Sequence, residues 1–357
     1  TEQGKEIIGI LTHLIDQTQN DCFHDKYFNG IDLDLSNALF IFSYNDVDAI
    51  DRILLDRIHR IKFDHLSLDD KLTITNTYLL PEIYKKMGLE GIISIDDTTI
   101  QYIIERYTCE PGVRKLKEVL FEVLGEINLS ILKDSNAYDL PIQITSENIK
   151  EKFLKDRQPT RIVRVPHSPS VGVINGLWAN SLGMGGVLSI ETKPFPSTNF
   201  LELKLTGMQG DVMKESMNVA KTLAWNMLPK TRAKVLQTDM KCCGIHVHVP
   251  EGSTPKDGPS AGTAIAVSLY SLFSDKHIPC DIAITGEICL QGRVTAIGGL
   301  DLKILGGISA GVKTFLFPRE NENDFKDFME KYGEKDIVKG INFIQISTIQ
   351  EVLTHVF

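Results

Sequence analysis

A mixed α/β domain preceded by a smaller helical domain is the fold class that this sequence predicts. From about residue 171 onward, short apolar runs typical of strands alternate with longer helical patterns, which is the order expected when helices pack on a sheet. Residues 67–133 instead show helical periodicity throughout. A stretch rich in proline and arginine at 156–170 separates the two parts and indicates a domain boundary.

Composition narrows the class of protein. The chain has 357 residues, enough for two or three domains, and its 42% hydrophobic and 24% charged residues are typical of a globular protein. A net charge of -9 does not favour nucleic acid as the main partner. No run is long and apolar enough to span a membrane, and the first residues match neither a signal nor a transit peptide. We expect an intracellular soluble protein of the cytoplasm or mitochondrial matrix.

The amino-terminal segment contains three recognisable features. Residues 7–14 form an amphipathic helical pattern, and the apolar run Ala38–Ser43 predicts a strand that ends next to Asn45. Arg57 follows at the end of a short helical pattern. A strand followed by Asn and then by an exposed Arg suggests a nucleotide-sensing edge, while a solvated surface charge explains Arg57 equally well.

The helical part has its own start signals. Ser67 and Ser94 are each followed three residues later by aspartate, which resembles a capping box. Pro111 is expected to open a long helix, with Arg114 exposed in its first turn, where a cation suits either an anionic ligand or plain solvent. The helix should bury one apolar stripe, made of Leu116, Val119, Leu120, Val123, Leu124, Ile127 and Ile131.

In the α/β part, strands are expected at 171–174, 187–191, 201–205, 245–249, 281–285, 288–294, 313–318 and 341–346, with helices at 211–227, after Gly299 and at the carboxyl end. Glycines at 183–186 lack the dinucleotide-binding pattern, and the printed sequence contains no phosphate-binding P-loop motif. Cys242 and Cys243 are near His246 and His248 and could share a metal, but free cysteines are the commoner case, and we predict no metal site.

The loop before Ser260 is the strongest functional signal. The strand-like run ending at Val249 leads into P-E-G-S-T-P-K-D-G-P-S-A-G, and a helix that is apolar nearly all round follows. A serine in the first turn of such a helix lies where unpaired N–H groups stabilise an oxyanion. Gly258 lets a substrate backbone come close. An ordinary serine cap on a core helix is the alternative.

Two chemistries compete to activate Ser260. Residues 258–262 fit the G-x-S-x-G elbow of an α/β-hydrolase, with His277 or His355 available as base, but the preceding strand ends too early for that turn. In the second chemistry a lysine is the base, which requires burial to lower its pKa. Lys303 lies among leucines and isoleucines near a helix start. A lysine that merely lies at the edge of the core would have the same neighbours.

The ordered motifs of the α/β part resemble the protease domain of the Lon family of ATP-dependent proteases. They comprise the Ser260 segment, T-G-E at Thr285–Glu287, G-G-L-D-L-K ending in Lys303, G-I-H-V-H-V-P, and T-G-M-Q-G-D-V-M-K-E-S at 206–216. The amino-terminal part is similar to the AAA+ module of that family, with Asn45 at its sensor-1 position, Arg57 at its arginine finger and Arg114 at sensor 2.

The resemblance implies a Ser260–Lys303 dyad that cleaves peptide bonds. It implies that Thr285 orients the lysine, that Asp257 and Glu287 shape the site, and that His246 and His248 line or brace it. It also implies ATP and Mg²⁺ as cofactors of the family, hexameric rings as the assembly, and unfolded polypeptides as substrates. Two departures stand out: Asp301 occupies a usually basic position, and Trp178 comes one position early.

We therefore predict a remnant of the AAA+ large subdomain at 1–64, a helical lid at 65–155 and a Lon-type protease domain at 156–357. Because no P-loop is found, we expect nucleotide binding by this chain to be doubtful and its activity to be limited to peptides. The main alternative is a catalytically silent assembly or regulatory module, in which a 3₁₀ turn plugs Ser260. An elbow-type esterase is the third reading.

Overall fold

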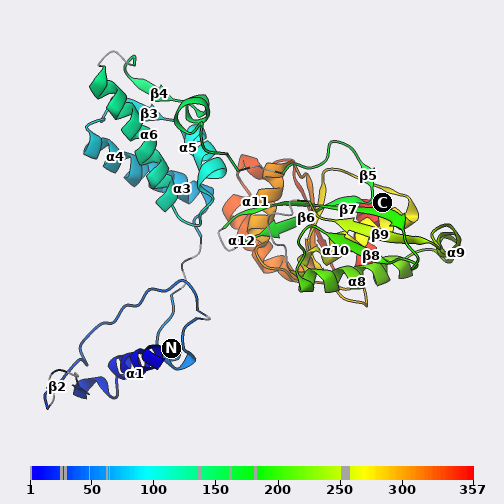
Figure 1. The fold of residues 1–357 in the computed structure, drawn as a ribbon, viewed down its shortest axis with the longest axis horizontal. Coiled ribbons are helices and arrows are strands. Elements are labelled where there is room, and N and C mark those ends of the chain that lie inside the picture. The colour runs from blue at the N-terminus through cyan, green and yellow to red at the C-terminus, as the bar shows by residue number, and fades with distance from the viewer. Residues whose placement is uncertain are drawn as a thin grey trace. The chain divides into compact units, whose positions relative to one another are not determined.

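The computed structural model describes the chain except for residues 1, 25–26, 28–29, 48, 62, 64, 135–137, 161–162, 181–182 and 251–257. The chain divides into two compact units, Thr1–Asp64 and His65–Phe357 (Figure 1). Within the second unit we distinguish a helical part, residues 65–155, from an α/β part, residues 156–357.

The first unit has little regular structure. Its elements are α1 (Glu2–Ile15), a 3₁₀ helix (Asn20–Cys22), the antiparallel pair β1 (Phe23–His24) and β2 (Asp32–Leu33), and α2 (Arg52–Leu55). The predicted strand at Ala38–Ser43 is wrong, because this segment is irregular. In the described part of the unit no strand lies alongside it to complete a hydrogen-bonded ladder, and Leu39 and Ile41 are 86% and 83% exposed.

The helical part is built around one apolar stripe. Its elements are α3 (Leu68–Ile74), a π-helix (Thr75–Leu79), α4 (Leu80–Met87), β3 (Ile93–Ile95), α5 (Asp97–Ile103), a π-helix (Ile104–Thr108), α6 (Arg114–Lys133), β4 (Ile142–Ile144), α7 (Ser146–Asn148) and a π-helix (Ile149–Phe153). Every predicted stripe residue of α6 from Leu116 to Ile127 is buried, and Ile131 packs at the edge of the same cluster. This confirms the periodicity argument.

The helix starts were predicted less well. Ser67 and Asp70 form the expected capping box of α3. Ser94 lies in β3 instead, and the cap of α5 is Asp96, whose carboxylate accepts from the Thr99 N–H. Aspartate is as good a cap as serine, so the pattern alone did not distinguish two nearby candidates. The long helix begins at Arg114, after the turn that contains Pro111.

The α/β part contains a mixed sheet with helices on both faces, which confirms the predicted fold class. Its strands are β5 (Ser170–Val171), β6 (Val173–Ala179), β7 (Gly185–Pro196), β8 (Leu203–Thr206), β9 (Cys243–His248), β10 (His277–Ile278), β11 (Ile282–Ile284), β12 (Glu287–Ile288), β13 (Val294–Thr295), β14 (Thr314–Pro318) and β15 (Asn342–Ile346). Its helices are α8 (Asp211–Asn226), α9 (Lys230–Asp239), α10 (Gly262–Ser274), α11 (Leu300–Ala310), α12 (Glu322–Tyr332) and α13 (Ile349–Val356), with short 3₁₀ turns at Pro259–Ala261, Arg319–Asn321 and Asp336–Val338.

Seven strands form the main sheet in the order β15-β14-β11-β6-β7-β9-β8. Strands β6 to β9 of this sheet are labelled in Figure 1. All neighbours are parallel except β7, which runs antiparallel to β6 and β9. The predicted hairpin is also present, as the antiparallel pair β12 and β13. It follows β11 directly and lies against the start of α10.

Alternation along the strands divides the core into two layers. On β14, Leu316 packs in a cluster with α8, α10 and α13, whereas Phe315 and Phe317 pack in a second cluster with α11 and α12. On β11, Ile284 and Ala283 divide in the same way. Because successive strand side chains point to opposite faces, α10 and α11 cover opposite faces of one sheet.

Candidate active site

The first turns of α10 and α11 lie at the same edge of the main sheet, the one formed by the carboxyl ends of β6 and β11. Strands β6 and β11 are parallel, with Gly176 opposite Ile284, so their carboxyl ends lie at the same edge. The residues following β11 bind the turn before α10, and α11 starts beside Ala179, the last residue of β6. The carboxyl edge of parallel strands is where α/β proteins usually place their sites.

Ser260 lies at this edge inside a 3₁₀ helix that runs directly into α10. Its carbonyl oxygen accepts a hydrogen bond from the Gly286 N–H at 2.8 Å and one from the Thr285 hydroxyl at 3.4 Å. Gly258, just before the turn, has a φ of +132°, a backbone conformation that side-chain-bearing residues rarely adopt. Ser260 is therefore anchored through its backbone carbonyl, and because it is only half-buried it stays partly accessible to solvent.

The first amides of α10 already have acceptors. The Gly262 N–H donates to the Pro259 carbonyl, and the Thr263 N–H donates to the Gly286 carbonyl at 3.1 Å. The Thr263 hydroxyl donates to the same Gly286 oxygen at 2.9 Å. An oxyanion contact from this helix therefore has to come from amides before Gly262, or to follow a rearrangement of the 3₁₀ turn.

Lys303 lies in the first turn of α11 and is only 4% exposed. Burial lowers the pKa of its amine from 10.5 to about 8, because a low-dielectric surrounding disfavours the charged form. No hydrogen bond to this amine is found among the described residues. This is the electrostatic state that a lysine needs in order to accept a proton near neutral pH.

The helix that carries Lys303 is fixed on the sheet by glycines. A Cβ on Gly185, at the start of β7, would lie 2.0 Å from the Leu302 carbonyl oxygen, and one on Gly306 would lie 2.1 Å from the Gly185 backbone. Such distances leave room for hydrogen atoms alone. Sequence reasoning excluded the glycines at 183–186 as a dinucleotide site but missed the packing role of Gly185 and Gly306, for which the paired glycines at 185–186 and 306–307 were the available signal.

Thr285, Glu287 and Asp257 are the residues near Ser260 that were expected to support the dyad. Thr285 is fully buried, and its hydroxyl donates to Ser260; its predicted bond to Lys303 stays a prediction. Glu287 begins β12 with an exposed side chain. Asp257 lies outside the described residues.

His246 and His248 lie away from this edge. They are on β9, and the hydroxyl of Thr206 bonds to both rings, at 2.8 and 2.7 Å. His248 is opposite Glu191 of β7, which is opposite Val173 at the amino end of β6. Six residues of β6 separate that level from Ala179, roughly 20 Å along the strand. These histidines could therefore influence the site only indirectly, through the segment 249–258 that connects β9 to Ser260.

The nucleotide-sensing candidates belong to both units. Asn45 is exposed in an irregular segment of the first unit. Arg57 follows α2, and its side chain donates to Asp16 at 3.2 Å and to the Ile53 carbonyl at 3.1 Å. Arg114 is the first residue of α6 and is 91% exposed, with Glu118 at 3.5 Å. Arg57 is thus engaged with a carboxylate of its own unit.

The described residues contain no group of three or more His, Cys, Asp and Glu side chains arranged to hold a metal ion. They also contain no helix that is both long and apolar enough to cross a membrane.

Comparison with known proteins identifies both parts of the second unit. Residues 143–357 match the family model of the Lon protease C-terminal proteolytic domain, and residues 85–139 match that of the Lon protease AAA+ ATPase lid domain. The chain belongs to the Lon protease family.

Full-length relatives agree with this assignment. The chain is 36% identical over 356 residues to a Lon protease of Campylobacter jejuni, covering 97% of this chain and 43% of the relative. It is 36% identical over 344 residues to a Lon protease of Methanosarcina barkeri, covering 96% and 41%. With a Lon protease homolog of Acanthamoeba polyphaga mimivirus the identity is 34% over 411 residues, covering 98% and 40%. The chain thus spans about two-fifths of the length of these relatives.

Proposed function

We propose that this chain is a serine endopeptidase in which Ser260 and Lys303 form a catalytic dyad. The observation that carries the proposal is the lowered pKa of a lysine that is 4% exposed, in the first turn of α11. At pH 7.5 a pKa of about 8 leaves roughly a quarter of the amine neutral, compared with about a thousandth at a pKa of 10.5. Ser260 reaches the same sheet edge from the opposite face.

The proposed reaction has two steps. As the Ser260 Oγ bonds to the peptide carbonyl carbon, its proton moves to the Lys303 amine; when the C–N bond breaks, the ammonium returns that proton to the leaving amine. In the second step Lys303 takes a proton from a water molecule whose oxygen bonds to the acyl carbon. As the ester C–O bond breaks, the ammonium returns the proton to the Ser260 Oγ and the new carboxylic acid leaves. Thr285 and Gly286 fix the backbone of the nucleophile through the Ser260 carbonyl.

We further propose that the three domains predicted from the sequence act in a longer, ATP-dependent assembly. In it Asn45, Arg57 and Arg114 would sense bound nucleotide and Mg²⁺ would accompany the ATP, in a hexameric ring acting on unfolded polypeptides inside the cell. In this structure Arg57 bonds to Asp16, so nucleotide contact requires that pair to open. No catalytic step described above depends on nucleotide.

One observation favours the second candidate, a silent assembly or regulatory module. Ser260 lies within a 3₁₀ helix, and the amides of Gly262 and Thr263 that follow it are bonded to other carbonyls. If this turn does not rearrange and no amide before Gly262 reaches the oxyanion, oxyanion stabilisation is weak and turnover is lost.

Hydrolysis of an unstructured fluorogenic peptide, without ATP, tests the proposal. We expect turnover by the unmodified chain, its loss in Ser260→Ala and Lys303→Ala, and its retention in Lys313→Ala, a matched exposed lysine, and in His277→Ala. Loss in His277→Ala with retention in Lys303→Ala would identify the elbow chemistry instead. An inactive unmodified chain would favour the silent module.

A further inference from the structure

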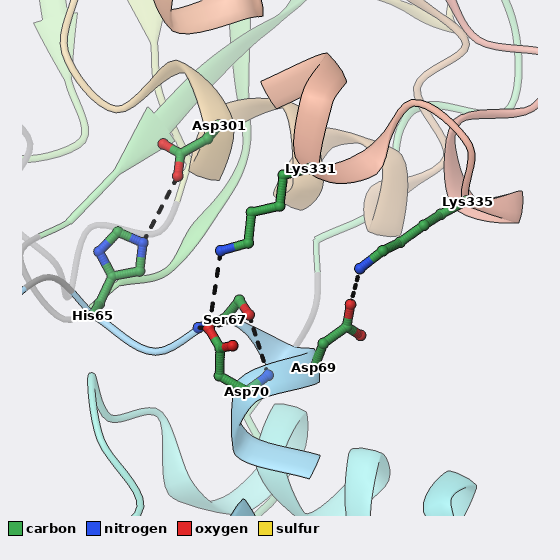
Figure 2. Close-up of polar contacts among 7 residues, drawn as sticks. All are labelled: His65, Ser67, Asp69, Asp70, Asp301, Lys331 and Lys335. Atoms are coloured by element: carbon green, nitrogen blue, oxygen red, sulfur yellow. Dashed lines mark hydrogen bonds and ion pairs between the residues drawn. The ribbon is translucent and has the colours of Figure 1, made fainter. Parts of the chain in front are cut away.

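The start of the helical part is joined to the α/β part by charged side chains (Figure 2). Three side-chain pairs bridge the two parts: His65 to Asp301 with 3.8 Å between Nε2 and Oδ2, Asp70 to Lys331 with 3.9 Å between Oδ2 and Nζ, and Asp69 to Lys335. The first is an ion pair only when His65 is protonated. His65, Asp69 and Asp70 come from the segment before α3 and from its first turn. Their partners are Asp301 in α11, Lys331 in α12 and Lys335 in the turn that follows α12. We call these six residues the junction cluster.

One acidic member of the cluster, Asp70, is also held by hydrogen bonds within its own turn. The Ser67 hydroxyl donates to Asp70 Oδ2 at 2.5 Å, and the Ser67 N–H donates to the same oxygen at 3.0 Å. These bonds lower the pKa of the Asp70 carboxyl, with a smaller contribution from the Lys331 and Lys335 charges. On the other side, the ring of Tyr332 is 8% exposed and lies beneath the Lys335 amine, 4.9 Å from its centroid. A cation over an aromatic face is attracted to it.

The pair at Asp301 reaches the helix of the proposed base. Asp301 is the second residue of α11 and Lys303 is the fourth, so the two side chains leave the same turn on different sides. His65 also lies against Gly183, where a Cβ would be 2.7 Å from its own Cβ. One residue before α3 therefore contacts both the segment that precedes β7 and the first turn of α11.

We propose that the junction cluster is an electrostatic latch that couples the orientation of the helical part to the first turn of α11, and that Asp301 is a positioning residue for Lys303. Single exposed ion pairs contribute little, but here three neighbouring pairs act together, and the amines of two of them, Lys331 and Lys335, also lie over the ring of Tyr332. The latch is strong enough to set a preferred orientation and is weakened by salt. Movement of the helical part would thus be felt at Lys303. The role of Asp301 rests on the proposed function, whereas the latch itself does not.

Hydrogen exchange of backbone amides in the full chain tests the latch without requiring activity. We expect Asp69→Lys and Lys335→Glu each to speed exchange over 65–70 and 300–303 by roughly two- to fivefold, and the combined Asp69→Lys/Lys335→Glu variant to restore slow exchange. Lys339→Glu, which breaks the exposed pair with Asp336, is the matched control and should leave both segments unchanged. A combined variant that exchanges as fast as the single variants overturns the latch.

Peptide hydrolysis then tests the positioning role. We expect Asp301→Asn to lower kcat and shift the midpoint of the acidic limb of the pH profile with KM unchanged, and Asp301→Glu to keep both near the unmodified values. Identical kcat and pH midpoints in Asp301→Asn and the unmodified chain would overturn the role of Asp301. A chain that hydrolyses no peptide at all contradicts the proposed function and this role together, and the exchange experiment still decides the latch.

Discussion

Replacing the buried amine of Lys303 by a methionine side chain is expected to stabilise the α/β part while abolishing its chemistry. The two side chains are similar in length, so packing is conserved and the charge is removed. The fall in pKa from 10.5 to about 8 means that folding destabilises the ammonium by about 3 kcal/mol at pH 7. Lys303→Met should raise the free energy of unfolding by an amount of that order, because no burial of a charge opposes folding.

The pH dependence has a defined sign. The pKa of Lys303 is lower in the folded protein than in the unfolded chain, so the unfolded state binds more protons between pH 8 and 10.5. The unmodified protein should therefore gain stability relative to Lys303→Met as pH rises through that window. Below pH 8 the difference between the two proteins should be largest and constant.

Urea unfolding followed by tryptophan fluorescence measures this difference, because the two tryptophans of the chain, Trp178 and Trp225, both lie in the α/β part. Ser260→Ala is the control for lost activity without removal of a charge, and Lys313→Met is the control for removal of an exposed lysine. A Lys303→Met protein no more stable than the unmodified one at pH 7, or a difference that does not shrink toward pH 10, would refute the reasoning.

Two further changes test the packing of α11 on the sheet and the hydrogen bonds at the start of α6. Gly306→Ala would place a Cβ 2.1 Å from the Gly185 backbone and should destabilise the protein by on the order of 2 kcal/mol in thermal unfolding. The control is Gly125→Ala in α6, where the nearest atom to a new Cβ is 3.7 Å away; it should stabilise the protein by about 0.5–1 kcal/mol. Equal effects of the two substitutions would contradict the packing argument. Glu110→Gln replaces with a neutral amide the carboxylate that accepts hydrogen bonds from the backbone amides of Lys115 and Leu116. It should lower the free energy of unfolding by about 1 kcal/mol, measured by thermal unfolding followed by circular dichroism. An unchanged melting temperature would contradict this.

Much of the α/β architecture was predictable because its strands are apolar runs separated by turn residues. The hairpin around Gly292 and the strand at 314–318 needed only local pattern. The segment Ala38–Ser43 has the same pattern and forms no strand, because a strand also needs a neighbour to pair with. The sequence shows the apolar strand pattern, but it does not show whether a neighbouring strand is present to pair with it.

The site was only partly predictable. The burial of Lys303 could be predicted from its leucine and isoleucine neighbours in the sequence, because a helix that is apolar on most sides packs into the core. The distance of His246 and His248 from Ser260 depends on the register of β7 between β6 and β9, which local sequence does not encode. The approach of α11 to Gly185 is likewise a contact between distant segments, visible in the sequence only as pairs of glycines.

Covalent labelling of Ser260 by a small phosphonate ester, followed by intact-mass spectrometry from pH 6 to pH 10, tests the central claim most directly. It requires neither peptide binding nor release of a product. If Lys303 activates the serine, one label is added at Ser260, its rate rises with a midpoint near the pKa of about 8, and Lys303→Ala removes the pH-dependent rise. Labelling that proceeds equally fast in Lys303→Ala, or at a residue other than Ser260, would contradict the dyad.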